Sequence, residues 1–326
     1  MGTVVALSGQ VGGAKLADGF RRLRGKDFAV VVNTGDDHEV FGLAFSPDID
    51  TMLYTLAGLA SPAAGWEPSG ETYALHEMLH RFGSEHRVRV GDRSFALPLL
   101  RTEALREERT LSQITLDFCK TMGIASRVLP MSNDPVRTVV VTDDGNVSYH
   151  EYLTELECEP VVKGFLYAGA DVARVPEEVL EALYAPDLEA IVICPANPYH
   201  TIGPILAVQG MRELLRERGV PVIGVSPIVG NKALKGAAAK MMQELGHEAS
   251  ARRAALEYYR LIDGFVIDSV DEAAAADIRA CAIEVAVAPT IMRTEQDRTA
   301  LAQVVLDLAK VLRERKLAER DAERGE

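Results

Sequence analysis

The stretch VALSGQVGGAKL, residues 5–16, decides the fold class, because it runs an apolar strand directly into a glycine-rich turn and a helix. A second apolar strand at residues 28–32 ends in NTGDD. Such a turn lets the backbone approach an anion, and the N–H groups that open the helix point at it. Gly9, Gly12 and Gly13, which can take positive φ, are predicted to bind phosphate with Lys15. A tight turn without a ligand is the alternative, because the spacing matches neither GxGxxG nor the P-loop pattern.

The bulk composition excludes several classes of protein. The 326 residues, 48% hydrophobic and 25% charged, suit one large α/β domain or one domain with an insertion. A net charge of −13 argues against a sequence-independent nucleic-acid binder. No apolar run approaches the ~20 residues that span a bilayer, so no membrane partner is expected. Without CxxC spacing, the four cysteines indicate small buried hydrophobes in a reducing cytosol, and we expect a cytoplasmic protein.

Helices and strands alternate along the chain. Helical periodicity predicts helices at residues 49–59, 71–82 and 111–123, and period-two alternation predicts a hairpin at residues 137–152 with Asp144 and Gly145 at its tip. Further on, the order is strand (190–195), helix (203–219), strand (220–227), helix (237–246), and a C-terminal amphipathic helix runs from residue 298.

This order predicts an α/β fold, a Rossmann-like three-layer sandwich with a mostly parallel sheet. We assign residues 1–66 and 160–326 to the nucleotide- and substrate-binding core. Residues 67–159 are predicted to form an inserted helical and hairpin lobe.

Carboxylates follow the second strand and open the next helix, in NTGDD (residues 33–37) and SPDID (residues 46–50). Hard cations that bridge substrate phosphates take such oxygen ligands, so the pattern predicts Mg²⁺ bound by Asp36, Asp37 and Asp50. The alternative is that an Asp of SPDID, Asp48 above all, only caps the following helix.

Two later loops also follow predicted strands. In ANPYHTIGPIL, residues 196–206, Asn197, Thr201 and Gly203 are predicted to face a ligand at the mouth of the sheet, with a helix N-terminus behind them. His200 in this loop is interpreted as a surface residue, as a lone loop histidine more often is, and a general base is the alternative.

The second loop, SPIVGNKALKGAAAKMM at residues 226–242, carries Ser226, Lys232 and Lys235. The two lysines are predicted to neutralise a diphosphate, because ligands gather beyond the carboxyl ends of the strands. A solvated loop with two lysines is the alternative.

Together the segments LSGQVGGAKL, VVNTGDD, GLAFSPDIDT, GDR, LPMSNDPVRT, NPYHTIGPIL and SPIVGNKALKGAAAKMM resemble, in order, the 2-phospho-L-lactate transferase family of coenzyme F420 biosynthesis. The resemblance implies a homodimeric transferase that requires Mg²⁺ and has no protein nucleophile. Its donor is a guanosine diphosphate ester of a phosphorylated three-carbon acid: 2-phospho-L-lactate, phosphoenolpyruvate or 3-phosphoglycerate. The terminal hydroxyl of the deazaflavin Fo (7,8-didemethyl-8-hydroxy-5-deazariboflavin) attacks the acid's phosphorus, and GMP leaves.

The resemblance also assigns roles to residues. Asp50, Arg93 and Thr51 fall where the family contacts Fo, Asp36 and Asp50 are the catalytic candidates, and Trp66 lies in a GWG-like stretch. The nucleotide and phosphate positions are Gly9, Gly12, Gly13, Lys15, Asn197, Thr201, Gly203, Ser226, Lys232 and Lys235. Because Asp50 is predicted at a loop–helix junction, Asp50→Ala is expected to abolish transfer and leave the fold intact.

The chain departs from the family pattern at three places, of which the first is the GWG-like stretch around Trp66, which here reads GWEPSGET at residues 65–72 and leaves open whether Trp66 acts as an aromatic lid. Gln10 replaces a glycine of the first loop, and Ser94 to Pro98 replace the DLATH that follows GDR. These changes leave the donor acid open. They also keep an alternative in view, a non-catalytic or regulatory protein of the wider family that binds a nucleotide-sugar phosphate and ignores Fo.

Overall fold

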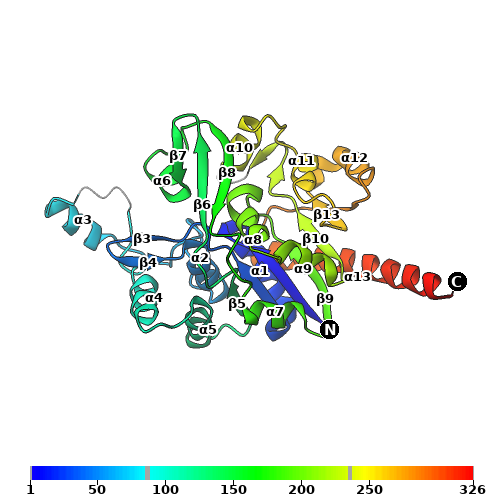
Figure 1. Ribbon diagram of the computed structural model, residues 1–326, viewed down its shortest axis with the longest axis horizontal. Helices are drawn as coiled ribbons and strands as arrows, with labels where there is room; N and C mark the ends of the chain where they lie inside the picture. Colours follow the sequence, from blue (N-terminus) through cyan, green and yellow to red (C-terminus); the bar gives the residue numbers. More distant parts are fainter. Residues whose placement is uncertain (1, 85–88, 234–236, 326) are drawn as a thin grey trace.

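The computed structural model describes residues 2–84, 89–233 and 237–325 (Figure 1). Its centre is a seven-stranded sheet of order β14-β13-β10-β9-β1-β2-β5, in which every neighbouring pair is parallel. The strands are β1 (Thr3–Ser8), β2 (Phe28–Val32), β5 (Arg127–Pro130), β9 (Leu188–Ile193), β10 (Val222–Val225), β13 (Gly264–Ile267) and β14 (Glu284–Val287). The predicted α/β class with a mostly parallel sheet is confirmed.

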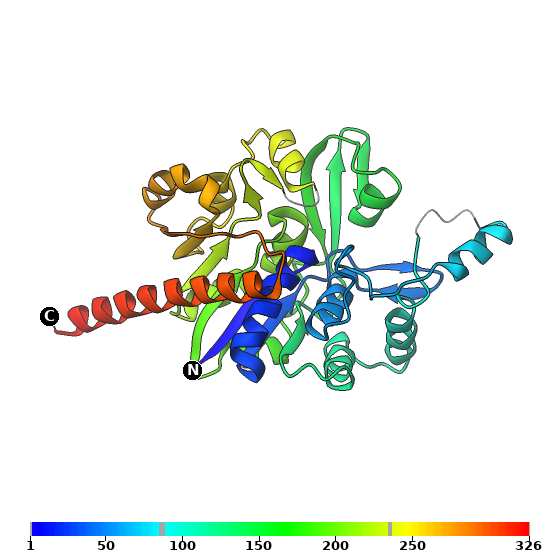
Figure 2. The same cartoon turned by 180° about the vertical axis from the view of Figure 1, so that it is seen from behind.

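Helices cover both faces of this sheet, because successive strand side chains point to opposite sides. Val4 and Ala6 of β1 enter one core cluster, and Val5 and Leu7 enter the other. The first cluster lies under α1 (Gln10–Arg24), α2 (Pro47–Leu56), α5 (Leu111–Thr121) and α13 (Glu295–Gly325). The second lies under α7 (Glu177–Leu183), α8 (Gly203–Ala207), α9 (Met211–Glu217), α10 (Ala238–Glu244), α11 (Ala251–Leu256) and α12 (Ala275–Arg279). Figure 2 shows α13 crossing one face and projecting beyond the body.

A small antiparallel sheet of order β7-β6-β8 stands beside the main one (Figure 1). It consists of β6 (Arg137–Thr142), β7 (Gly145–Ser148) and β8 (Val162–Ala168), with α6 (Tyr149–Thr154) following β7. The division into a core and a lobe of residues 67–159 stays a prediction, and two strands cross it. β5, from within that range, pairs with β2 of the main sheet, and β8, from outside it, pairs with β6.

The remaining elements are short. The pair β3 (His38–Val40) and β4 (Leu43–Phe45) forms a hairpin that packs against α4 (Ala96–Arg106), while α3 (Ala74–Arg81) extends away from the body. The others are β11 (Ile228–Val229), β12 (Lys232–Ala233), η1 (Gly25–Asp27), η2 (Pro198–Ile202) and η3 (Ser269–Ala274).

Two predicted elements are wrong in detail. The helix expected at residues 203–219 is divided into α8 and α9, because Gly210 between them takes a left-handed φ of 79°. The second strand of the hairpin ends at Ser148, whose side chain caps α6, so residues 149–152 are helical.

The four cysteines are unpaired, and Cys119 and Cys194 are buried as expected, whereas Cys158 and Cys281 are half-buried. Among the described residues, no helix combines the length and the apolar character that crossing a bilayer requires.

Candidate functional site

A cavity of about 540 Å³ opens beyond the carboxyl ends of β1, β9 and β10, where open α/β sheets bind ligands. The N-terminus of α1 forms one wall, and the segment after β14 forms another. Several predicted residues line it: Gly12, Lys15, Asn197, Ser226 and Trp66. Gln10, Val11, Pro195, Ala196, His200, Pro227, Val229, Ala237, Ala238, Thr290, Ile291, Met292 and Arg293 complete the lining.

The glycines of the first loop serve close packing rather than positive φ. Gly9 is extended, with φ −176°, and it is Gln10 that takes the left-handed conformation, with φ 56°. A Cβ on Gly9 would lie 2.4 Å from Asp48 Oδ2, and one on Gly12 would lie 2.6 Å from the Pro195 carbonyl oxygen. On Gly13 it would lie 2.2 Å from Ser8 Oγ. Glycine is therefore needed here for space.

Asp48 fastens the start of α1 to the end of β2. Its Oδ1 accepts from the Gln10 backbone N–H at 2.8 Å, and its Oδ2 accepts from Asn33 Nδ2 at 2.9 Å. Asp48 is the second residue of α2, but both of these partners lie outside that helix. The interpretation of Asp48 as only a helix cap is not supported.

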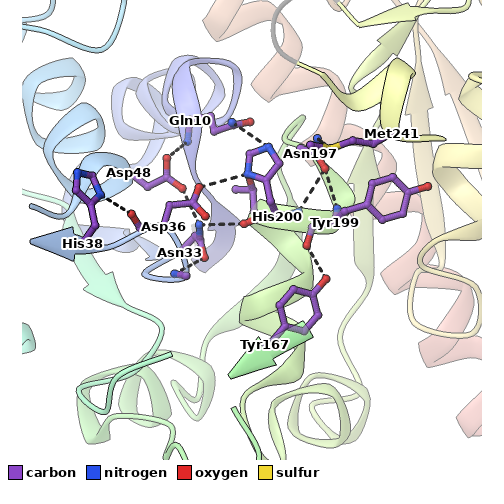
Figure 3. A network of polar contacts seen from close by, with 12 residues as sticks. Gln10, Asn33, Asp36, His38, Asp48, Tyr167, Asn197, Tyr199, His200 and Met241 are labelled. Atoms are coloured by element: carbon purple, nitrogen blue, oxygen red, sulfur yellow. Dashed lines mark hydrogen bonds and ion pairs between the residues drawn. The ribbon is translucent and has the colours of Figure 1, made fainter. Parts of the chain in front are cut away.

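Asp36 lies between Asp48 and His200, as Figure 3 shows. Its Oδ2 is 3.3 Å from Nδ1 of His200, whose ring stacks on Tyr149 with the centroids 3.9 Å apart. Among the described residues, Asp36 Oδ1 is the only buried carboxylate oxygen without a hydrogen bond of good geometry, although the Asn33 and Thr138 side chains are near enough to lower the pKa of Asp36 against the effect of burial. His200 is 1% exposed, so its interpretation as a surface residue is wrong.

Burial sets the electrostatics of this cluster. It raises the pKa of Asp36 well above its usual range and that of Asp48 to about 7, where the charge of Asp36 adds to the effect. Burial also raises the pKa of Asp37 to about 8, against the opposing charge of Arg137. It lowers the pKa of His200 to about 3, which keeps the imidazole neutral. The site thus concentrates carboxyl groups that a bound cation would ionise.

Asp37 and Asp50 do not line the cavity, and each is held by another side chain. Asp37 Oδ2 accepts from Ser46 Oγ at 2.8 Å. Both oxygens of Asp50 accept from the buried guanidinium of Arg101, through Nη2 to Oδ1 and through Nη1 to Oδ2 at 3.3 Å. Burial raises the pKa of Asp50, and the charge of Arg101 opposes that rise.

These residues fit a Mg²⁺ ion only in part. In the described part of the chain, no three His, Cys, Asp or Glu side chains gather closely enough to hold a metal ion by themselves. Mg²⁺ commonly takes one or two carboxylates and completes its shell with water and substrate phosphates. Oδ1 of Asp36, which makes no hydrogen bond of good geometry, suits that role, and Asp37 is adjacent. Asp50 would join only by giving up a contact with Arg101.

The other predicted residues occupy varied positions. Thr201 is buried and its hydroxyl lies 3.3 Å from His200 Nδ1, while Gly203 packs so tightly on Tyr167 that a Cβ would be 2.0 Å from the phenol oxygen. Thr51 is buried in α2. Arg93 donates to the Ser69 carbonyl oxygen, outside the cavity lining. Exposed Lys232, on β12, is likewise outside the lining, and Lys235 falls outside the described residues.

Several residues of the site escape sequence reasoning. Tyr149 and the cavity wall at residues 290–293 reach the site from a helix and a loop with no local signal, and Arg101 reaches it from α4. Asn197 is predicted as a ligand group, but its side chain also closes its own loop: Oδ1 accepts from the Tyr199 N–H at 2.8 Å. The arginine within the apolar run ALPLLRTEAL was the one available hint of a buried charge.

Comparison with known proteins agrees with this architecture. The family model described as 2-phospho-L-lactate transferase CofD matches residues 4–307. The chain is 37% identical over 314 residues to the 2-phospho-L-lactate transferase of Methanopyrus kandleri, which covers 95% of this chain and 98% of that protein. It is also 37% identical over 317 residues to the phosphoenolpyruvate transferase of Streptomyces griseus, with 95% and 99% covered.

A solved structure shares the fold. A UPF0052 family protein of Bacillus halodurans superposes with a TM-score of 0.59 at 16% identity, over 94% of this chain and 99% of that one. The family match and the relatives, each spanning nearly the whole chain, mark an enzyme of the transferase class. The chain belongs to the 2-phospho-L-lactate transferase (CofD) family.

Proposed function

We propose that this transferase moves a phosphorylated three-carbon acid from its guanosine diphosphate ester to the terminal hydroxyl of Fo, in coenzyme F420 biosynthesis. The new bond joins the Fo oxygen to the acid's phosphorus, and the bond to the bridging oxygen breaks, so that GMP leaves. The observation that carries the proposal is the 540 Å³ cavity between the N-terminus of α1 and the segment that follows β9, residues 195–200. His200 lines this cavity, and the Asp36 carboxylate lies beside His200. The proposed cellular location of the protein is the cytoplasm.

The cavity is assigned to the guanylyl diphosphate portion of the donor. The N-terminus of α1 carries partial positive charge, which favours phosphate, and the helix N–H groups that follow Gln10 point toward it, whereas the Gln10 N–H already donates to Asp48. Lys15, on the same helix, adds a cation to the lining. Gly12 has no side chain and therefore takes up little space on this wall. Ser226 and Asn197 supply neutral hydrogen-bonding groups on the opposite wall.

The acidic cluster is assigned to the reacting end. Asp36, with Asp37 beside it, would hold Mg²⁺, which when bound neutralises the phosphate oxygens that gain charge during transfer. A buried carboxylate of raised pKa also accepts a proton readily at neutral pH. Asp50, whose pKa burial also raises, is therefore the first candidate to take the hydroxyl proton, and Asp36 is the second, in the form that does not hold the cation, because a bound cation lowers the pKa of its ligands. Arg93 and Thr51 remain the proposed contacts to Fo.

The donor acid follows from neither the cavity nor the relatives. The lactate and enolpyruvate transferases are equally similar to this chain, at 37% identity each. The substrate class is therefore a phosphorylated three-carbon acid, and the glycerate derivative belongs in the same test.

The experiment supplies purified protein with Fo, Mg²⁺ and the guanosine diphosphate ester of lactate, enolpyruvate or glycerate in separate reactions, and follows products by mass. One phosphodiester of Fo, with GMP released in equal amount, is expected. Asp36→Asn should lose at least 100-fold in turnover, the scale of losing a key electrostatic group, and Asp117→Asn on exposed α5 should behave as wild type. If a control enzyme is active in the same assay but this protein forms no product from any donor and does not bind Fo, the nucleotide-binding alternative would be favoured.

Homodimerisation is part of the proposal. Apolar side chains are exposed on α3 and α4, among them Phe82, Leu99 and Leu100, and such patches often mark interfaces. Sedimentation equilibrium should give twice the chain mass of 35.4 kDa, and a single-chain mass would contradict the dimer.

A further inference from the structure

Gln10 holds a strained backbone conformation at the edge of the cavity. Its φ of 56° is a left-handed value that side chains with a Cβ rarely adopt. Strain of this kind persists where surrounding contacts fix the residue, and it concentrates at functional sites. One such contact is the backbone N–H of Gln10, which donates to Asp48 Oδ1.

The Gln10 side chain makes the second contact. Its amide Nε2 lies 3.3 Å from Nε2 of His200, and both residues line the cavity (Figure 3). At the other edge of the imidazole, Nδ1 lies 3.3 Å from Asp36 Oδ2 and 3.3 Å from Thr201 Oγ1. Stacking on Tyr149 fixes the plane of the ring. The three side chains therefore form a hydrogen-bonded series in the order Gln10, His200, Asp36.

The chemistry of these groups determines which atom donates and which accepts in each hydrogen bond of the series. The NH₂ group of Gln10 only donates, so His200 Nε2 is the acceptor. A neutral imidazole with a bare Nε2 carries its hydrogen on Nδ1. That N–H then donates to Asp36 Oδ2, while Asp36 Oδ1 makes no hydrogen bond of good geometry.

We propose that Gln10 is a positioning residue: it fixes the tautomer of His200, and His200 in turn holds Asp36 so that Oδ1 is presented for its role in transfer. The inference rests on the proposed function of Asp36. It adds a residue of the glycine-rich first loop, Gln10, that contacts no reacting group itself and acts through His200 and Asp36. Partners of metal-binding carboxylates and histidines act in this way.

The first test reads the tautomer directly in the ligand-free protein. With ¹⁵N-labelled histidine, two-bond ¹⁵N–¹H spectra distinguish the protonated ring nitrogen from the bare one, and a His200→Gln sample identifies the signals of His200. Wild type should carry hydrogen on Nδ1. Gln10→Met keeps a side chain of similar length without a donor, and Gln10→Gly also relieves the left-handed strain. Both variants should lose the preference for Nδ1.

The second test measures turnover. Both variants should lower kcat about tenfold or more, the usual effect of removing a supporting contact, with a smaller change in KM for the donor ester. Ala282→Gly is the matched control, since Ala282 has φ 60° and is exposed on the segment before β14. It should change neither the spectrum nor kcat.

The outcomes separate the two proposals. Hydrogen on Nε2 of His200 in wild type would overturn the inference, and so would variants that keep both the Nδ1 tautomer and wild-type turnover. The expected spectra in a protein that transfers nothing to Fo would support the contact between Gln10 and His200, but would contradict the proposed function and, with it, the positioning role in transfer. Melting temperatures of the Gly variant at or above wild type would exclude misfolding as the cause of lost turnover.

Discussion

At the scale of single residues, the site depends on the absence of a side chain at Gly9. A Cβ there would meet Asp48 Oδ2 at 2.4 Å and Thr201 Cγ2 at 2.5 Å. Gly9→Ala should therefore displace Asp48 and the start of α1, destabilise the protein by about 1–3 kcal/mol through overpacking, and abolish transfer. Urea denaturation and the product assay check both effects. Gly164→Ala, on β8 with nothing within 4 Å of the new Cβ, is the control, and a fully active Gly9→Ala would contradict the packing argument.

The same scale shows what the sequence could predict of the site. Gly12, Lys15, Asn197 and Ser226 follow strands or open a helix, so local pattern alone places them at one edge of a sheet, and they line the cavity. The pairing of Asp36 with His200 is different: it joins residues 164 positions apart. No periodicity distinguishes a histidine buried by such a contact from one on a surface loop.

At the scale of elements, the ion pair between Asp50 and Arg101 ties α2 to α4. Arg101 is 1% exposed and also donates to the Ala44 carbonyl oxygen of β4 at 3.1 Å. Asp50→Ala leaves a buried guanidinium without its counter-ion, so we expect unfolding free energy to fall by about 3–5 kcal/mol. This replaces the expectation, from the sequence, of a lost cap alone. The double variant Asp50→Ala, Arg101→Met should regain much of the loss in urea denaturation. An Asp50→Ala protein as stable as wild type but inactive would instead show that Asp50 acts in transfer.

Element prediction succeeded where burial dominates and failed where local contacts decide. Continuous apolar runs such as AIVICP identify buried parallel strands, and β9 and β10 follow them. Residues 149–152 alternate like a strand, but the Ser148 side chain caps a helix there through the Glu151 N–H. The apolar pattern at residues 203–219 is helical throughout, but the extended ψ of 132° at Val208 and the left-handed φ of 79° at Gly210 divide it.

At the scale of the whole molecule, the buried acids make stability depend on pH. The folded pKa values of Asp37, about 8, and Asp48, about 7, lie far above the unfolded value near 3.8. Between pH 4 and these values the folded state binds more protons than the unfolded state, so stability falls as pH rises. His38 and His200, with folded pKa values of about 4 and 3, oppose this trend only below about pH 6.5, where unfolded histidines protonate. The window from pH 6.5 to 8 therefore reports the carboxyl groups.

In that window, Asp37 and Asp48 alone should cost the ligand-free protein about 2 kcal/mol of unfolding free energy, from 1.36 kcal/mol per proton and pH unit, and Asp36, whose pKa burial also raises, adds to the loss. Urea denaturation at pH 6.5, 7.2 and 8.0 measures the slope. Asp37→Asn should flatten it by roughly half, because the amide does not titrate, whereas Asp117→Asn, on exposed α5, should leave it unchanged. Saturating Mg²⁺ with GDP should remove most of the slope, since a cation bound by Asp36 and Asp37 favours their ionised forms and the folded state then binds no more protons at these two groups than the unfolded state. A slope that Mg²⁺ and GDP leave unaltered would mean that the acids do not face a bound metal, and the metal role of Asp36 and Asp37 would have to be abandoned.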